Sequence, residues 1–349
     1  MTVKINSKNN LKMVEKIILV VGAYPPDACG IGDYSSQLVH ADERHWECIV
    51  WKDWSFSGLC KLLCSIKKSN VRYINLQYPT KASYGSLMPH LLCIYIAFFS
   101  HKRFMVTLHE FMRMGLRYRL AAVLFLLFAN KVIFTTQVER KYASNIIPFR
   151  KKQFVVIPIY SNIVKAHVFK TTNERTCDIA YFGLISPNRN IEHFIDLVKN
   201  VRLSHKCVSA KIIGMVVEGS EDFLSFLRQE AQNTGIEFHL NKSNEEVAEL
   251  LNDCKYTYLP FHDGVSERRG SFLASVLNGA IVITTKGPWT SSKFDKVCYY
   301  IDSDELHLVK RILDGVETSK SQSDIFEYLQ SDVVKSWVDV SNRYLSLCS

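Results

Sequence analysis

Short apolar runs rich in β-branched residues alternate with longer stretches of helical periodicity along most of the chain, and this alternation restricts the fold more than any other feature. Ile17 to Val21 is apolar at every position, which is typical of a strand whose two faces are both covered by helices. The pattern predicts an α/β protein built on parallel sheets.

The predicted strands fall into two sets. The first set spans residues 16–21, 48–51, 71–76, 103–108, 131–134 and 154–157, and the second spans 178–182, 211–215, 236–240, 256–260, 281–284 and 297–301. Predicted helices begin near residues 31, 58, 86, 116 and 137 and span 191–201, 221–233, 244–252 and 271–277. We expect two Rossmann-like, doubly wound domains that face a central cleft, with ligands beyond the carboxyl ends of the strands.

The length of 349 residues suits two domains of similar size. We expect an N-terminal domain at residues 1–160, a linker at 161–176, and a C-terminal domain at 177–322. A long helical tail at 323–349 should pack back toward the N-terminal domain. The N-terminus is polar and the apolar stretches are shorter than the roughly 20 residues of a membrane span, so neither a signal peptide nor a spanning helix is expected.

The net charge of +9 is divided unevenly, because residues 1–175 carry +15 and residues 176–349 carry −6. A basic half could meet nucleic acid, an anionic membrane or a phosphorylated substrate. Nucleic acid is disfavoured, since the sequence has no zinc-finger spacing, RNP-like aromatic motif or basic heptad region. The ten cysteines form no Cys-x-x-Cys pair, which argues against a metal site and fits a reducing cytosol.

A glycine-containing loop follows the first predicted strand. Gly30 and Gly32 allow the backbone to approach a ligand, and the helix that begins there favours an anion or a polar sugar. Asp33 in the same turn is a candidate for the acceptor pocket. The loop departs from the Gly-x-Gly-x-x-Gly dinucleotide fingerprint. The alternative is a turn that merely needs glycine, but its place after the first strand favours ligand binding.

Polar residues also end the third and fourth predicted strands. His109 follows Val-Thr-Leu and could bond a sugar hydroxyl or position a reacting group, although a lone histidine is more often structural. Gln77 and Tyr78 hold the equivalent place after the third strand. They could line an acceptor pocket or cap a helix.

Cations mark two loops of the second half. Arg189 lies between a strand and a helix start, where a guanidinium could pair with phosphate oxygens or simply be solvated. A longer loop before the helix at 271–277 offers two cations and free N–H groups to a diphosphate. Its candidate donor-binding residues are Ser266, Glu267, Arg268, Arg269, Gly270 and Ser271.

The order of these loops resembles glycosyltransferase family 4, whose members have the GT-B fold and use nucleoside-diphosphate sugars. The resemblance implies that His109 is the catalytic histidine at the donor sugar, that Arg189 replaces a diphosphate-binding lysine, and that Gly30 and Gly32 contact diphosphate and acceptor. It also implies transfer with retention of configuration, without a metal or another cofactor.

The sequence departs from the family at three positions. Leu184 replaces an arginine, and two glutamates spaced eight positions apart fall on Ser266 and Ala274. Glu267 lies one residue out of register, and Arg268 or Arg269 would have to supply the missing cation. These departures keep open the alternative of a catalytically silent GT-B nucleotide-binding or partner subunit.

The Gly-Val-Ser-x-Arg-Arg-Gly-Ser segment that begins at Gly264 looks like a bacterial surface-polysaccharide subgroup. The acceptor implied is a lipid-linked glycan in O-antigen or capsule synthesis, and nucleic acid is not an expected partner. Arg113, Arg117 and Arg119 beside the apolar run 120–128 are typical of a helix on an anionic leaflet. We therefore expect a cytoplasmic protein that is peripheral at the inner face of the bacterial plasma membrane.

Overall fold

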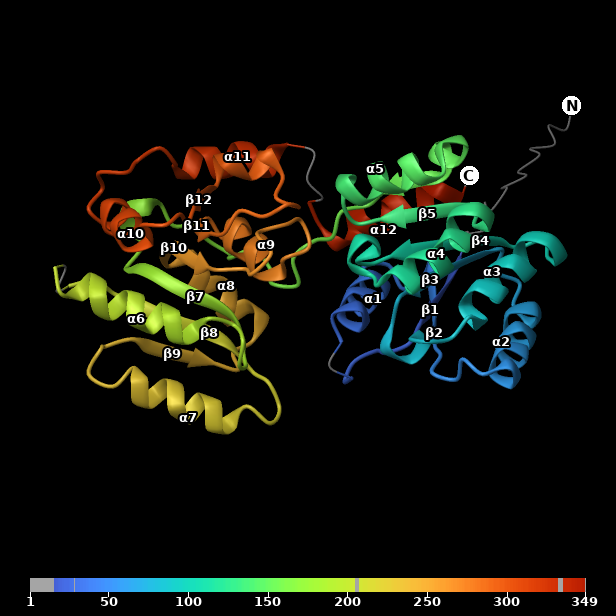
Figure 1. The fold of residues 1–349 in the computed structure, drawn as a ribbon, viewed down its shortest axis with the longest axis horizontal. Coiled ribbons are helices and arrows are strands. Elements are labelled where there is room, and N and C mark those ends of the chain that lie inside the picture. Colours follow the sequence, from blue (N-terminus) through green and yellow to red (C-terminus); the bar gives the residue numbers. More distant parts are fainter. Residues whose placement is uncertain (1–15, 28, 205–206, 332–334, 349) are drawn as a thin grey trace, which may run out of the picture. The chain divides into compact units, whose positions relative to one another are not determined.

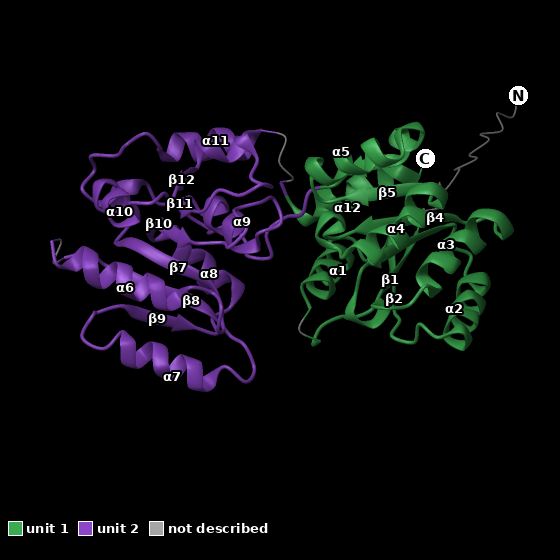
Figure 2. Ribbon diagram, in the orientation of Figure 1, with its two compact units in different colours: residues 1–157, 336–349 green, residues 158–335 purple. Residues whose placement is uncertain are grey.

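The computed structural model describes residues 16–27, 29–204, 207–331 and 335–348, and it divides the chain into two units (Figures 1 and 2). Unit 1 contains residues 1–157 and 336–349, and unit 2 contains residues 158–335. The chain therefore passes from unit 1 to unit 2 and returns.

The two units differ in charge. Unit 1 carries 23 Lys and Arg residues and 10 Asp and Glu residues, whereas unit 2 carries 20 Lys and Arg residues and 24 Asp and Glu residues. The positive charge is thus concentrated in unit 1.

Within its described residues, unit 1 is built on a six-stranded parallel sheet of order β2-β1-β3-β4-β5-β6. The strands are β1 (Ile17–Val21), β2 (Trp46–Val50), β3 (Tyr73–Tyr78), β4 (Arg103–Leu108), β5 (Lys131–Phe134) and β6 (Phe154–Val156). The α-helices are α1 (Gly30–Ala41), α2 (Phe56–Lys68), α3 (Met88–Phe99), α4 (Leu116–Phe128), α5 (Gln137–Ile146) and α12 (Trp337–Leu345).

The two faces of this sheet have different partners. Because side chains alternate along a strand, Ile74 and Leu76 of β3 join the apolar core with α2, α3 and α4, while Asn75 and Gln77 point to the other face. There α1 and α12 pack against each other. β1 is buried along its whole length, as its continuous apolar sequence predicts.

Unit 2 repeats this design, with the strand order β12-β11-β10-β7-β8-β9 among the residues described. Its strands are β7 (Cys177–Ile185), β8 (Ala210–Val216), β9 (Glu237–Leu240), β10 (Cys254–Leu259), β11 (Ile281–Thr284) and β12 (Cys298–Tyr300). Its α-helices are α6 (Ile191–Arg202), α7 (Glu221–Glu230), α8 (Asn244–Asn252), α9 (Gly270–Leu277), α10 (Glu305–Leu313) and α11 (Gln322–Gln330).

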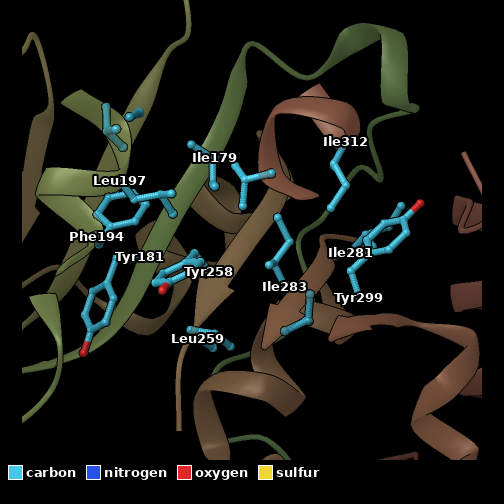
Figure 3. Packing of buried hydrophobic residues seen from close by; sticks show 14 of the residues in the cluster. Ile179, Tyr181, Phe194, Leu197, Tyr258, Leu259, Ile281, Ile283, Tyr299 and Ile312 are labelled. Atoms are coloured by element: carbon cyan, nitrogen blue, oxygen red, sulfur yellow. The ribbon is translucent and has the colours of Figure 1, made fainter. Parts of the chain in front are cut away.

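The core of unit 2 is rich in aromatic side chains (Figure 3). Tyr258 of β10 stacks on Phe194 of α6 with ring centroids 5.7 Å apart. Phe272 of α9 meets Phe294 edge to face at 4.8 Å. Such pairs add to the stabilisation from burial alone. They fix α6 and α9, whose N-termini lie at the carboxyl edge of the sheet.

Each predicted strand is present within about three residues of its expected ends, and the predicted α/β class with two doubly wound sheets is confirmed. Helix α10 is an element that the sequence pattern did not predict. The tail at 323–349 is not one long helix, because α11 lies in unit 2 and α12 lies in unit 1. Ser336 gives α12 its own N-cap by accepting a bond from the Asp339 amide.

Candidate functional site

The carboxyl ends of β1 and β3 mark the point in unit 1 where the strand order reverses, which is the usual ligand position in such a sheet. A Cβ on Gly22 would lie 2.8 Å from Cβ of Thr80, so the loops after these strands touch closely. A Cβ on Gly32 would lie 2.9 Å from the Ala23 carbonyl oxygen, whereas Gly30 has open space around it. Gly32 is therefore required for packing, and Gly30 is accessible.

Asp33 lies in the first turn of α1 and is half-buried. Burial raises the pKa of its carboxyl group. Helix N-termini favour anions, so a carboxylate here stabilises α1 but also competes with any other anion that approaches the same N–H groups. Asp33 is therefore better suited to bind a ligand hydroxyl group than a phosphate group.

His109 and Gln77 are brought together at the ends of β4 and β3. Nε2 of His109 lies 2.7 Å from Oε1 of Gln77, and both side chains are buried. The ring of Tyr34 from α1 meets the His109 ring edge to face, with centroids 5.2 Å apart. The imidazole is therefore held in a fixed orientation rather than left mobile at the end of a strand.

Tyr78 lies apart from this pair. It follows Gln77 directly, so its side chain points to the opposite face of the sheet, where it packs against His90 and Phe125. Burial raises the pKa of its phenol to about 12. The structure thus places Tyr78 in the core of unit 1. The alternation of side chains along a strand already indicates that Tyr78 and Gln77 point to opposite faces of the sheet.

In unit 2 the strand order reverses between β7 and β10. The loop after β7 turns sharply, because Asn188 and Asn190 both adopt left-handed conformations, with φ of 65° and 56°. No described side chain caps α6, so its first N–H groups remain available to an anion. Arg189 is exposed in this loop, which fits either a phosphate-binding cation or a solvated side chain.

The loop after β10, residues 260–269, is braced by the loop after β11. Oγ1 of Thr290 donates to the carbonyl of Val265 at 2.9 Å, and Oγ1 of Thr285 donates to the carbonyl of Phe261. Nδ2 of Asn190 reaches the Pro260 carbonyl at 3.5 Å. The loops on both sides of the reversal point are therefore connected.

The predicted donor-binding residues differ in their surroundings. Arg269 forms an ion pair with Asp263, and its guanidinium lies 4.7 Å from the centroid of the Phe261 ring. Ser266 is buried, whereas Gly270 is exposed at the start of α9 and Ser271 is half-buried. A phosphate that bound Arg269 would have to compete with the Asp263 carboxylate. The sequence did not reveal this ion pair between Arg269 and Asp263.

Glu267 and Arg268 lie between Ser266 and Arg269 in the sequence, and both are half-buried. Burial raises the pKa of Glu267, although Lys293 and Arg268 partly oppose this effect. No described residue caps α9 through a side chain, and its first turn contains no acidic residue. The α9 N-terminus therefore keeps its positive character beside Arg268.

A further polar cluster at this edge was missed by sequence reasoning. Glu305, the first residue of α10, accepts a hydrogen bond from the Tyr258 hydroxyl and lies 2.5 Å from Nε2 of His193. Burial and the bond to Glu305 raise the pKa of Tyr258. The three residues are far apart in sequence, so no local motif announces them.

The candidate membrane-contact arginines lie near the start of α4. Arg117 is exposed, Arg113 lies 3.6 Å from Glu110, and Arg119 donates to the Tyr142 hydroxyl at 3.3 Å. Large apolar side chains are exposed beside them on the adjacent helices α3 and α4 and the segment before α3. We call this the α3–α4 surface, which comprises Tyr84, Leu87, Leu91, Leu116 and Leu120.

The described residues contain no helix with the length and hydropathy needed to span a bilayer. Nor do three or more His, Cys, Asp or Glu side chains gather in the described part of the chain as a metal site would require.

No protein-family model and no curated protein matches the sequence. The structure is similar to that of HepE from Anabaena, solved with UDP and glucose, with a TM-score of 0.63 and 14% identity over 96% of this chain and 99% of that chain. It is also similar to a glycosyltransferase from Rickettsia africae, with a TM-score of 0.65 and 11% identity over 95% and 97% of the two chains.

A third similar structure is the catalytic domain of starch synthase IV from Arabidopsis thaliana, bound to ADP and acarbose. Its TM-score is 0.60, with 11% identity over 95% of this chain and 98% of that chain. These likenesses cover both units, and at such low identity they establish the fold. The chain has the GT-B fold of two Rossmann-like units.

Proposed function

We propose that this chain is a glycosyltransferase that moves a sugar from a nucleoside diphosphate to a hydroxyl group. The observation that carries the proposal is the arrangement at the carboxyl edge of unit 2. There the uncapped N-termini of α6 and α9, together with Arg189 and Arg268, flank the point where the strand order reverses. A diphosphate is the ligand that this arrangement fits best.

The same groups suit the chemistry of transfer. When the bond between sugar and diphosphate breaks, negative charge grows on the leaving phosphate, and fixed N–H groups and guanidinium groups stabilise it. They would do so without a metal or another cofactor. We propose that configuration is retained and that His109 contacts the donor sugar, with Gly30 beside the ligand. The nucleotides in the HepE and starch synthase IV structures support a nucleotide donor.

We propose a lipid-linked glycan as the acceptor, in the synthesis of a bacterial surface polysaccharide such as O-antigen or capsule. The positive charge of unit 1 and the α3–α4 surface support a location at an anionic leaflet. α3 and α4 follow neighbouring parallel strands, so both begin at the carboxyl edge of the sheet, where His109 also lies. A lipid-borne acceptor at the bilayer would therefore approach the correct edge of unit 1.

The proposal is tested first by binding and then by turnover. Calorimetry with UDP, GDP and ADP measures whether the chain binds a nucleotide and which base it prefers. Transfer from the matching nucleotide sugar to a lipid-linked acceptor then measures turnover. Wild type should bind and transfer, whereas Arg189→Gln and Arg269→Ala should lose affinity. Equal affinity and equal rates in all three proteins would remove the diphosphate site proposed here.

One observation favours a catalytically silent nucleotide-binding or partner subunit as the second candidate. Ala274 is fully buried and packs with Val247 and Leu251 of α8, so its methyl group fills a place where the resembling family has a carboxylate. Leu184 likewise brings no charge to the end of β7. Tight nucleotide binding without transfer or hydrolysis of any nucleotide sugar would favour this second candidate.

A further inference from the structure

Helix α3 contains no Asp, Glu, Lys or Arg, although it packs only against α2, α4 and the sheet of unit 1 among the described elements (Figure 1). Its inward face is apolar, because Leu92, Cys93 and Ile96 are buried in the core of unit 1. A surface helix normally turns polar side chains outward. The outward face of α3 is apolar as well, so this helix departs from the pattern of a helix that faces water.

The outward side chains form a stripe along the whole of α3. Leu87 and Leu91 belong to the α3–α4 surface, and Ile94 and Phe98 continue the same side of the helix at spacings of three and four residues. Phe98 is 64% exposed, and Phe99, the last residue of the helix, is 72% exposed. Because α3 connects the end of β3 to the start of β4, the stripe runs from the carboxyl edge of the sheet to its amino edge.

The amino edge of unit 1 brings basic segments together. Three such segments lead into the starts of β3, β4 and β6, and they are residues 66–72, 97–103 and 148–153. Since the strands are parallel, these segments lie at one edge of the sheet, opposite the candidate site. Nζ of Lys102 donates to the carbonyls of Ser69 and Val71 at 2.8 and 2.6 Å, which joins the first two segments. The rings of Phe98 and Phe128 lie 5.5 Å apart and join α3 to α4.

The third segment is joined to the end of α4. Nε of Arg150 donates to the carbonyl of Leu126 at 3.4 Å, and Nη2 of the same guanidinium donates to the carbonyl of Ala129. Phe149 beside it is 76% exposed. The three segments therefore form one connected surface. We call it the amino-edge patch, which comprises Phe98, Phe99, Phe149, Lys67, Lys68, Arg72, Arg103, Lys151 and Lys152.

The amino-edge patch combines exposed aromatic rings with unbalanced positive charge. Its six Lys and Arg side chains are all exposed, and the three segments contain no Asp or Glu. This charge attracts an anionic partner. A second copy of the chain fits poorly, since a two-fold interface would place six cations against six cations. An anionic bilayer offers headgroup charge and an apolar interior in one partner, so it suits the cations and the rings together.

We propose that α3 lies along an anionic bilayer over its whole length and that the amino-edge patch anchors its far end. The three phenylalanine rings insert between the headgroups, and the six cations pair with lipid phosphates. The inference rests on the proposed function for the anionic leaflet, and it adds a contact at the edge opposite the candidate site. Contacts at both ends of α3 set the orientation of unit 1, so the carboxyl edge stays at the height of a lipid-borne acceptor.

The experiment measures co-sedimentation of the full chain with phosphatidylcholine vesicles that contain phosphatidylglycerol, without any nucleotide sugar. The double variant Phe99→Ser with Phe149→Ser should bind roughly tenfold more weakly or less, because two rings no longer leave water for lipid. This loss should persist at high salt. Lys151→Gln with Lys152→Gln should also weaken binding roughly tenfold at low salt, and this second loss should shrink at high salt because ions screen charge.

Phe226→Ser is the matched control, because Phe226 is an exposed ring on α7 of unit 2. It should bind the vesicles as wild type does, and thermal unfolding verifies that each variant is folded. Unchanged binding of both amino-edge double variants, or an equal loss in Phe226→Ser, would overturn the inference. So would a wild-type dimer in sedimentation velocity that Phe99→Ser with Phe149→Ser converts to a monomer.

Two further outcomes separate this inference from the proposed function. If Arg117→Gln weakens vesicle binding and the amino-edge variants do not, the membrane contact ends at the α3–α4 surface and only the inference fails. If the amino-edge variants lose binding as expected and the wild type transfers no sugar, the inference holds and only the proposed function fails.

Discussion

Gly264 and Gly287 hold the loops after β10 and β11 in backbone contact. A Cβ on Gly264 would lie 2.6 Å from Cα of Gly287, and a Cβ on Gly287 would lie 2.5 Å from the carbonyl carbon of Asp263. Gly264 also has a φ of +83°, which residues with a side chain rarely adopt. The shape of the candidate donor-binding loop thus depends on two residues without side chains.

We expect Gly264→Ala to lower the free energy of unfolding by more than about 2 kcal/mol, because the left-handed conformation costs about 1–2 kcal/mol and the methyl group also forces the loops apart. Urea denaturation measures this loss. Gly219→Ala is the matched control, since Gly219 has a φ of +80° and no neighbour within 4 Å of an added Cβ. Equal losses in the two variants would mean that the contact with Gly287 contributes nothing.

His90 is a buried histidine in the apolar core of unit 1. Its ring stacks on Phe125 with centroids 4.4 Å apart and meets Tyr78 edge to face at 5.4 Å. Among the described residues neither ring nitrogen has a hydrogen-bond partner. Burial lowers the pKa of His90 to about 4, although the backbone at Leu87 partly offsets this effect. The folded protein therefore keeps the ring neutral at pH values where the unfolded chain would protonate it.

This difference makes stability fall as the pH decreases. Between the ordinary histidine pKa of 6.5 and the folded value near 4, the unfolded chain binds a proton that the folded chain does not. The loss across this window should approach about 3 kcal/mol, and it should stop growing below pH 4. Urea midpoints at pH 7 and pH 4.5 measure it. His90→Leu should show a smaller loss than wild type, and parallel pH profiles for the two proteins would contradict this account.

Sequence patterns were sufficient for the sheets because each strand is defined by its own residues. The continuous apolar run of β1 and the regular spacing of the strands both predict a parallel sheet with two covered faces. Parallel sheets of this type hold ligands at their carboxyl ends, so the positions of His109 and Arg189 also followed from local sequence. The predicted placement of these residues at loop starts required no long-range information.

The remaining features depend on contacts between residues that are distant in sequence. Nothing near Thr107 indicates that Tyr344 will reach it, and nothing near Glu305 indicates that Tyr258 and His193 will meet there. The pairing of Arg269 with Asp263 is different, because only five residues separate them, but the direction of a side chain in an irregular loop has no periodic signal. Sequence therefore located the loops and not the partners within them.

The ion pair between Arg269 and Asp263 leads to an expectation about nucleotide binding. Arg269→Ala removes a cation and also exposes the Asp263 carboxylate beside the proposed diphosphate position. It should therefore weaken UDP binding by roughly tenfold or more, since hydrogen bonds to charged groups contribute about 1.5–3 kcal/mol. Arg268→Ala should cost less, because it leaves that ion pair intact.

The double variant Asp263→Asn with Arg269→Ala separates the two effects. It should bind UDP more tightly than Arg269→Ala alone, because the repulsive carboxylate is gone. Calorimetry on wild type, the two single variants and the double variant completes the cycle. Equal UDP affinity of the double variant and Arg269→Ala would mean that Asp263 does not act on the bound nucleotide.

Arg117 should contribute more to membrane binding than Arg119, although both lie on the first turns of α4. Arg117 is exposed beside Leu116 and Leu120, which are 65% and 63% exposed, whereas Arg119 is directed toward Tyr142. A cation near an anionic leaflet contributes about 1 kcal/mol, so Arg117→Gln should weaken binding to phosphatidylglycerol-containing vesicles roughly fivefold. Arg119→Gln is the matched control and should change binding less.

Vesicles of phosphatidylcholine alone should not distinguish the two variants, because the difference arises from charge. Equal affinity of wild type and Arg117→Gln for the anionic vesicles would show that the α3–α4 surface serves a different partner.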